Sequence, residues 1–318
     1  MAREFGLNFA MLRSVLLQCF VMSLMFGCSK QDVVPPEFNG QRAFSYLVGQ
    51  VEFGPRVPGT EASEACRSYL VRHFQSLSFE VDSQSFSFYD PYSRSDVPLV
   101  NVIARFHGTD DAARSIVLMA HYDSRPRTDY AFDSTLRDQP IDGANDGASG
   151  VAVLMELGNL MAERPPRCNL DLVLVDGEDW GRLGDDEYYL LGSRHFAASG
   201  IRDRYRFGIV VDMVGDANQE IFREEFSQKF VTELNDFVWS TARQLNLSTF
   251  QDTTRHAMMD DHLSLNVGGV PAVLIVDFDY PYWHTEYDRP DRCSAESLEN
   301  VGRLLAQIVY TSSWPKLK

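Results

Sequence analysis

Short apolar runs, separated by polar stretches, recur along the chain between residues 99 and 276. Each run has six to eight residues and is rich in Val, Ile and Leu. Continuous runs of this length are typical of strands buried on both faces of a sheet. A further segment alternates in part between apolar and polar residues, which is also typical of a strand. The predicted strands are Phe79–Tyr89, Leu99–Phe106, Ser115–Ala120, Leu170–Val175, Phe207–Met213 and Val270–Val276.

Longer segments between these strands predict helices. The clearest is Val151–Met161, where an almost unbroken apolar run indicates a helix packed on several sides. Thr60 and Ser294 precede acidic residues in a first turn, as helix N-caps do. Strands that alternate with helices indicate an α/β domain with a largely parallel sheet. The other predicted helices are Gly40–Glu52, a helix from Thr60 to about Leu77, Gly192–Ala198, Ser227–Leu245 and Ser294–Thr311.

Residues 1–28 have the pattern of an export signal. Positive residues precede the apolar run Val15–Phe26, which is too short to span a bilayer. A small residue and then Cys28 follow, as in the lipobox of bacterial lipoproteins, so we expect lipidation at Cys28. An ordinary signal peptide with an incidental cysteine is the alternative. We expect residues 29–39 to be a linker and residues 40–318 to form a single domain. The protein would be exported to the periplasm or to the membrane surface of a bacterial envelope.

Composition and charge narrow the classes of partner. The chain is 44% hydrophobic and 23% charged, which is ordinary for a globular protein. Its formal net charge of −16 would repel phosphate backbones, so we expect no nucleic-acid partner. No CxxC pair occurs, which argues against a cysteine zinc site. One disulfide among Cys66, Cys168 and Cys293 stays open.

Histidine and acidic residues follow the predicted strands at the points where the strands end. In open α/β sheets, ligands bind beyond the carboxyl ends of the strands, so these side chains are expected to converge. Nitrogen and oxygen ligands with an open position are what a hydrolytic zinc site needs. The pattern therefore predicts a zinc site at this rim. The candidates are His121, Asp123, Asp146, Glu178, Asp179, Asp212 and His284.

Two of these positions have alternative interpretations. Asp146 lies in a glycine-rich loop just before the buried helix, where it could be a ligand or simply a helix N-cap. Glu178 and Asp179 are adjacent, so their side chains point different ways. One could bind a metal while the other acts as general acid or base, or both could be solvated loop acids. Arg125 and Arg127 are expected to lie in a solvated loop.

Seven short motifs follow one another along the chain: His121-Tyr-Asp-Ser124, Gly143-Ala-Asn-Asp146, Asp176-Gly-Glu-Asp179, Leu191-Gly-Ser-Arg-His-Phe-Ala197, Val211-Asp-Met-Val-Gly215, Asp260-Asp-His262 and Trp283-His-Thr285. In this order they resemble the zinc-dependent exopeptidases of the bacterial aminopeptidase type. Within that group, the sequence is most similar to the glutaminyl-peptide cyclotransferases, or glutaminyl cyclases. The resemblance extends from residue 53 to the C-terminal helix and implies a three-layer α/β/α sandwich around a mixed, mostly parallel, twisted sheet.

The resemblance implies roles for individual residues. Asp146, Asp179 and His284 match the ligands of a single catalytic zinc, and Asp179 stands where animal cyclases usually have Glu. Glu178 matches the residue that shuttles the proton. The resemblance also implies a cis peptide bond between Asp146 and Gly147. The other implied site residues are Asp212 and Asp260, which share hydrogen bonds with Glu178, and Trp283 as a wall of the substrate pocket, with Trp180 and Tyr282 as further candidates.

The activity implied by the resemblance is conversion of an N-terminal glutamine to pyroglutamate with release of ammonia. The partners would be peptides or proteins with N-terminal Gln, acted on by a monomer whose contact with a membrane is only a lipid anchor. The alternative is an aminopeptidase with two zinc ions, in which His121 and Asp212 would hold the second metal and Asp146 would bridge. A third class, an inactive binding domain, would have lost some of these residues, and none is lost.

Overall fold

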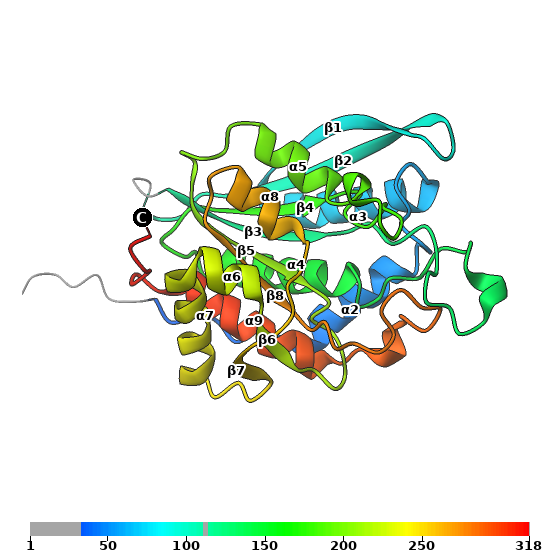
Figure 1. Ribbon diagram of the computed structural model, residues 1–318. Coiled ribbons are helices and arrows are strands. Elements are labelled where there is room, and N and C mark those ends of the chain that lie inside the picture. The colour runs from blue at the N-terminus through cyan, green and yellow to red at the C-terminus, as the bar shows by residue number, and fades with distance from the viewer. Residues whose placement is uncertain (1–32, 111–113, 318) are drawn as a thin grey trace, which may run out of the picture. The chain divides into compact units, whose positions relative to one another are not determined.

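The computed structural model describes residues 33–110 and 114–317. At its centre is a six-stranded sheet with the strand order β1-β2-β4-β3-β5-β8 (Figure 1). Neighbouring strands from β4 to β8 are parallel, whereas β1 and β2 form an antiparallel edge. The strands of this sheet are β1 (Glu80–Asp90), β2 (Ser95–Phe106), β3 (Ser115–His121), β4 (Leu170–Val175), β5 (Tyr205–Asp212) and β8 (Ala272–Val276).

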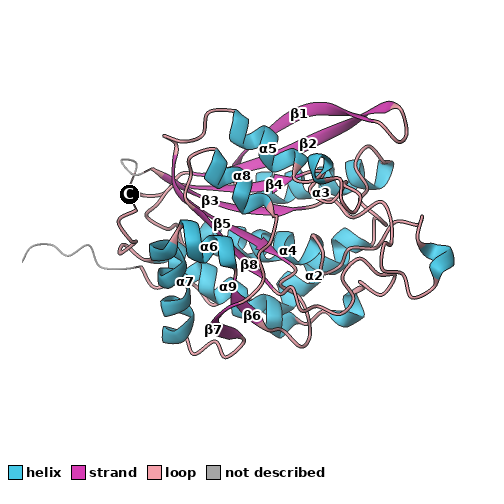
Figure 2. Cartoon of the chain, viewed as in Figure 1, coloured by secondary structure: helices cyan, strands magenta, loops and turns pink. Residues whose placement is uncertain are grey.

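Helices cover both faces of the sheet (Figure 2). Strand residues such as Leu118 and Leu172 pack with α2, α3, α4, α7 and α9, while their neighbours Val117 and Val173 pack with α5 and α8. The predicted three-layer α/β/α sandwich with a mixed, mostly parallel sheet is therefore confirmed. The helices are α2 (Gly40–Val51), α3 (Glu61–Ser76), α4 (Ala148–Glu163), α5 (Leu191–Ala198), α6 (Glu225–Phe230), α7 (Thr232–Gln244), α8 (Asp261–Val267) and α9 (Ala295–Tyr310).

The predicted long helix Ser227–Leu245 is wrong, because the chain breaks it into α6 and α7. Val231 lies between them with φ −138° and ψ 49°, which is outside the helical region. The sequence pattern also missed α8 and a small parallel pair, β6 (Ile221–Arg223) and β7 (Phe250–Thr254). Strand β7 is mostly exposed, and strands and helices of this length leave little periodic signal.

Three expectations concern the ends and the cysteines. The export signal, the lipidation at Cys28 and most of the linker lie outside the described residues. Cys66, Cys168 and Cys293 are buried free thiols, so the open question of a disulfide among them is answered in the negative. No helix in residues 33–110 or 114–317 has the length and apolar character needed to cross a membrane.

Candidate metal centre and active site

The strand ends predicted to converge do meet at one rim of the sheet. His121 is the last residue of β3, Asp212 is the last residue of β5, and the loop after β4 carries Glu178 and Asp179. Asp146 lies immediately before the glycine that caps α4. His284 comes from the loop that follows β8, where it adopts the left-handed backbone conformation with φ 55°. Parallel strands thus deliver side chains from distant parts of the sequence to one place.

Asp146, Asp179 and His284 form a buried set whose ligand atoms all lie within 4.8 Å of one another. Nε2 of His284 is 3.3 Å from Oδ2 of Asp179 and 3.5 Å from Oδ2 of Asp146. Ligand atoms about 2.0–2.1 Å from a tetrahedral zinc would be separated by about 3.3 Å. Oδ2 of Asp179 is also buried and accepts no hydrogen bond, which is unusual for a buried carboxylate unless it serves an ion. The set therefore fits a zinc ion.

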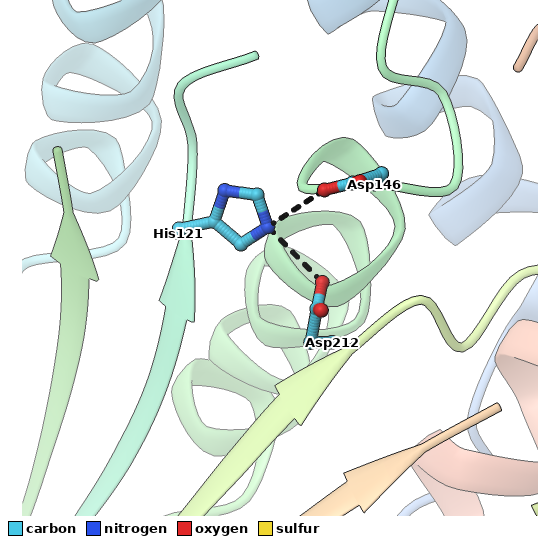
Figure 3. A group of neighbouring side chains, drawn as sticks. All are labelled: His121, Asp146 and Asp212. Carbon is cyan, nitrogen blue, oxygen red and sulfur yellow. Dashed lines mark hydrogen bonds and ion pairs between the residues drawn. The ribbon is translucent and has the colours of Figure 1, made fainter. Parts of the chain in front are cut away.

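A second set shares Asp146 and adds His121 and Asp212 (Figure 3). Nε2 of His121 lies 3.0 Å from Oδ1 of Asp212 and 3.2 Å from Oδ1 of Asp146. The two oxygens of Asp146 thus face different histidines, as a bridging carboxylate requires. Burial disfavours the charged imidazolium of His121, but Asp212, Asp123 and Asp146 outweigh it and hold its pKa well above the usual value.

Buried carboxylates fix the backbone of these loops. Asp123 is fully buried, and its two oxygens accept hydrogen bonds from the backbone N–H groups of Glu178 (3.2 Å) and Asp179 (3.3 Å). It also lies 3.5 Å from Nδ1 of His121, in the position expected of a partner that orients this ring. Asp288 does the same for Asp146, accepting its N–H at 3.1 Å. The sequence gives no periodic signal for Asp288.

Arg125 is not in a solvated loop, contrary to expectation. Its side chain is fully buried, and Nη1 contacts Oδ1 of Asp179 at 2.5 Å. Its guanidinium also pairs with Asp129, whose Oδ2 is 3.8 Å from Nδ1 of His284. Burial raises the pKa of Asp179, but Arg125 and then His284 outweigh it and hold that pKa well below its usual range. Arg127 is also partly buried, donating to the carbonyl oxygen of Trp180 at 2.8 Å.

The turn before α4 uses a glycine where a cis peptide bond was expected. No peptide bond among the described residues is cis, so the cis bond implied between Asp146 and Gly147 is wrong. Gly147 has φ +95° and is the N-cap residue of α4, so Asp146 is not the cap either. A Cβ at Gly147 would lie 2.7 Å from Cε1 of His121. This position therefore needs glycine both for its backbone angle and for the approach of His121.

Glu178 lies beside the metal set in a pocket of about 200 Å³. Burial raises its pKa well above the usual value; His121 opposes this, whereas the carboxylates of Asp179, Asp261 and Asp260 add to it. Asp260 lines the same pocket, and burial followed by Asp212 and Asp261 raises its pKa strongly. Neighbouring carboxylates resist ionising together, so they add to the effect of burial on the pKa of both Glu178 and Asp260.

Aromatic and apolar side chains form the rest of the pocket. Trp283 lines it as expected, and its ring is 3.9 Å from that of His284, centroid to centroid. Trp180 packs on Phe88 instead, and Tyr282 packs beneath Arg292; neither is among the described residues that line the pocket. Several lining residues could not be predicted from the sequence, because their side chains carry no carboxylate, imidazole or thiol that would mark a site: Leu183, Tyr189, Met213, Met258, Met259 and Phe278.

The pattern of peptidase family M28 matches residues 101–309, which is well over half of the chain. The chain belongs to peptidase family M28. This match includes all the metal-site candidates and confirms the resemblance to zinc-dependent exopeptidases.

Individual relatives narrow the comparison. The glutaminyl cyclase of Bacteroides thetaiotaomicron, bound to N-acetylhistamine, superposes with a TM-score of 0.82 at 31% identity, over 88% of this chain and 100% of that one. A leucine aminopeptidase precursor from the same organism gives a TM-score of 0.83 at 31% identity and the same coverage. The glutaminyl-peptide cyclotransferase of Bothrops jararaca is 25% identical over 80% of this chain and 76% of its own length.

The M28 relatives differ in how much of their length this chain spans. A zinc metalloprotease of Leptosphaeria maculans is 35% identical over 125 residues, which is 39% of this chain but only 27% of that protein. The chain thus spans about a quarter of this relative and about three quarters of the curated cyclotransferase. The family is zinc-dependent, in agreement with the donor set in the structure.

Proposed function

We propose that this M28 protein is a glutaminyl cyclase that converts the N-terminal glutamine of peptides or proteins to pyroglutamate and releases ammonia. The observation that carries this proposal is the position of Glu178, a carboxyl group with a raised pKa beside the buried set of Asp146, Asp179 and His284. Similarity to glutaminyl cyclases over almost the whole described chain supports it.

We assign one zinc ion to Asp146, Asp179 and His284. Zinc held there supplies a Lewis acid that polarises the side-chain amide carbonyl of the substrate glutamine. The separations of 3.3 and 3.5 Å within this set suit donor atoms that would hold one zinc ion together. His121 and Asp212 lie at 3.0 Å, a normal hydrogen-bond distance, and in this proposal they hold Asp146 in place without a second metal.

The residues of the chain then perform the proton transfers. The nucleophile is the α-amine of the substrate, which attacks the amide carbon of its own side chain to close a five-membered lactam. Glu178 accepts a proton from this amine and gives it to the departing ammonia. Asp260 and Asp212 line the same pocket as Glu178. Asp260 is among the carboxylates that raise the pKa of Glu178, and the raised pKa favours uptake of the amine proton. Trp283 walls the pocket and limits water around the reacting atoms.

The deciding experiment supplies a peptide with N-terminal Gln to the purified protein. We expect release of ammonia and a pyroglutamyl peptide. The mass of this product should be lower than that of the substrate by about 17 Da, the mass of one ammonia molecule, because ring closure expels ammonia. Metal content is measured on the same sample, with one zinc per chain expected. If the protein instead releases free leucine from a peptide with N-terminal Leu and does not cyclise the peptide with N-terminal Gln, the proposal is contradicted.

An aminopeptidase with two zinc ions is the second candidate function. The observation in its favour is the second set, in which His121 and Asp212 share Asp146 with the first. Two zinc ions per chain together with hydrolysis of N-terminal residues would establish this function.

For the N-terminus, we infer from its sequence pattern that residues 1–28 are a lipoprotein-type signal peptide, with lipid attached to Cys28, and that residues 29–39 link it to a single catalytic domain, 40–318. The protein would then be a periplasmic or membrane-anchored monomer. Labelling with a radioactive fatty acid in a bacterial host, compared between the wild type and Cys28→Ala, tests this inference.

A further inference from the structure

A mostly apolar groove between α5 and α8 opens beside the active-site pocket. Its volume is about 490 Å³. Two of its side chains are unusually exposed for apolar residues, with Val267 at 89% and Met259 at 38%. Exposed apolar side chains that gather in a groove often mark a binding site. The residues used here to define this α8 groove are Leu190, Arg194, Ala197, Met259, Leu263 and Val267.

The α8 groove adjoins the active-site pocket. Met259 lines both. Tyr189 lines the pocket, and the next residue, Leu190, lines the groove. On the other side, Asp260 lines the pocket and Leu263 lines the groove. A peptide that leaves the pocket along α8 would therefore pass the groove.

We propose that the α8 groove binds an apolar side chain at the third or fourth residue of the peptide substrate. This rests on the proposed function, which holds the N-terminal residue in the pocket. Leu263 and Val267 lie three and seven residues after Asp260, or about 4.5 and about 10 Å along a helix. An extended peptide advances about 3.3 Å per residue, so its third and fourth residues lie about 7 and about 10 Å beyond the first.

The walls of the α8 groove are held in place before any peptide binds. The guanidinium of Arg194 donates to the backbone carbonyl oxygens of Glu187 (2.9 Å) and Asp186 (3.1 Å). This fixes its aliphatic stem along the groove, where it can cover an apolar side chain. Leu190 is only 3% exposed and also cannot move freely. A preformed groove loses little entropy on binding, which favours a measurable preference among substrates.

The test compares two peptides that differ only at the third and fourth residues, Gln-Gly-Leu-Leu-amide and Gln-Gly-Ser-Ser-amide. For the wild type we expect kcat/KM to be about tenfold higher for the leucine peptide, equivalent to about 1.4 kcal/mol. In Val267→Glu this preference should fall to about twofold or less, because a charged carboxylate at the rim of the groove disfavours an apolar side chain bound beside it. Val34→Glu, the same change at a valine with 73% exposure outside the groove, should keep the wild-type preference.

Fluorescence anisotropy of the same peptides, labelled at the C-terminus, separates the two proposals. Ammonia release without any preference between the peptides, or a preference unchanged by Val267→Glu, would overturn the groove and leave the cyclase intact. A binding preference that Val267→Glu removes, in a protein that releases no ammonia, would support the groove and overturn the cyclase. A dimer seen by light scattering and lost in Val267→Glu, with no change in peptide preference, would assign the groove to a second copy of the chain.

Discussion

Replacing Gly147 with alanine should damage the metal centre more than its backbone angle alone explains. Gly147 has φ +95°, a conformation that costs an alanine about 1–2 kcal/mol. The added Cβ would also lie 2.7 Å from Cε1 of His121 and 2.8 Å from the carbonyl oxygen of Asp123. Overpacking of this kind costs about 1–3 kcal/mol. We therefore expect Gly147→Ala to lower the free energy of unfolding by about 2–5 kcal/mol.

Gly200 offers a matched control. Its φ is +79°, and no atom lies within 4 Å of the Cβ that an alanine would add. Gly200→Ala therefore carries the backbone cost without the clash, and we expect a loss of about 1–2 kcal/mol. Urea unfolding of both variants with a chelator present gives the two free energies directly. Equal losses in the two variants would refute the claim that His121 and Asp123 require glycine at position 147.

Zinc affinity is a second measurement that distinguishes Gly147→Ala from Gly200→Ala. Displacement of His121 would disturb the hydrogen bond to Asp146, and loss of such a partner typically lowers metal affinity about 10–100-fold. Gly147→Ala should show this loss in a competition titration with a zinc chelator, whereas Gly200→Ala should bind zinc like the wild type. Wild-type affinity in Gly147→Ala would show that His121 does not support the metal site.

Three further outcomes are expected. Glu178→Gln should keep its zinc but lose about 10²–10⁴-fold in kcat, since only proton transfer is removed; near-normal turnover measured by ammonia release would exclude Glu178 from this role. Removal of zinc by a chelator should lower the thermal midpoint of the wild type, because a ligand that binds only the folded state stabilises it. The chelator should change the thermal midpoint of Asp179→Ala very little. A drop in this variant as large as that in the wild type would contradict the assignment of Asp179 as a zinc ligand. Burial disfavours ionisation of Glu224, but His262 and backbone N–H groups outweigh this and lower its pKa to about 2. The stability that this group adds is therefore complete above its unfolded pKa of about 4.3 and lost as the pH falls towards 2. With a metal chelator present, the free energy of unfolding of Glu224→Gln should therefore depend less on pH in this window than that of the wild type. An unchanged slope would contradict the ion pair of Glu224 with His262, whose Nε2 lies 3.2 Å from Oε2 of Glu224.

The sequence was sufficient to predict the layers and the rim of the site. Apolar runs such as Leu170–Val175 predict buried strands because only a two-sided sheet hides every residue of the run, and β4 has the predicted bounds. The carboxyl ends of parallel strands share one edge, so His121, Asp212 and the Glu178-Asp179 pair could be grouped without coordinates. Helix ends were predictable where a cap is local, as at Ser294, whose side chain accepts from the N–H of Ser297.

Contacts between distant loops could not be predicted in this way. Arg125 reads as a polar loop residue, yet its contact with Asp179, 54 positions along the chain, buries it completely. Trp180 is adjacent to a metal-ligand candidate in sequence, but it packs on Phe88 and is absent from the described pocket wall. The local sequence predicts neither the burial of Arg125 nor the position of Trp180, because each depends on where a distant segment of the chain lies.

The amino-acid sequence by itself determined which residues could reach the rim of the sheet, since the positions of the strands and the chemistry of the residues at their ends follow from local patterns. Only the tertiary structure decided how those residues are held. The two oxygens of Asp146 face His121 and His284 because Gly147 turns the chain at φ +95° and Asp288 holds the backbone N–H of Asp146. Metal binding depends on distances between ligand atoms that must be correct to within a few tenths of an ångström. Long-range packing sets these distances, and no local sequence pattern contains them.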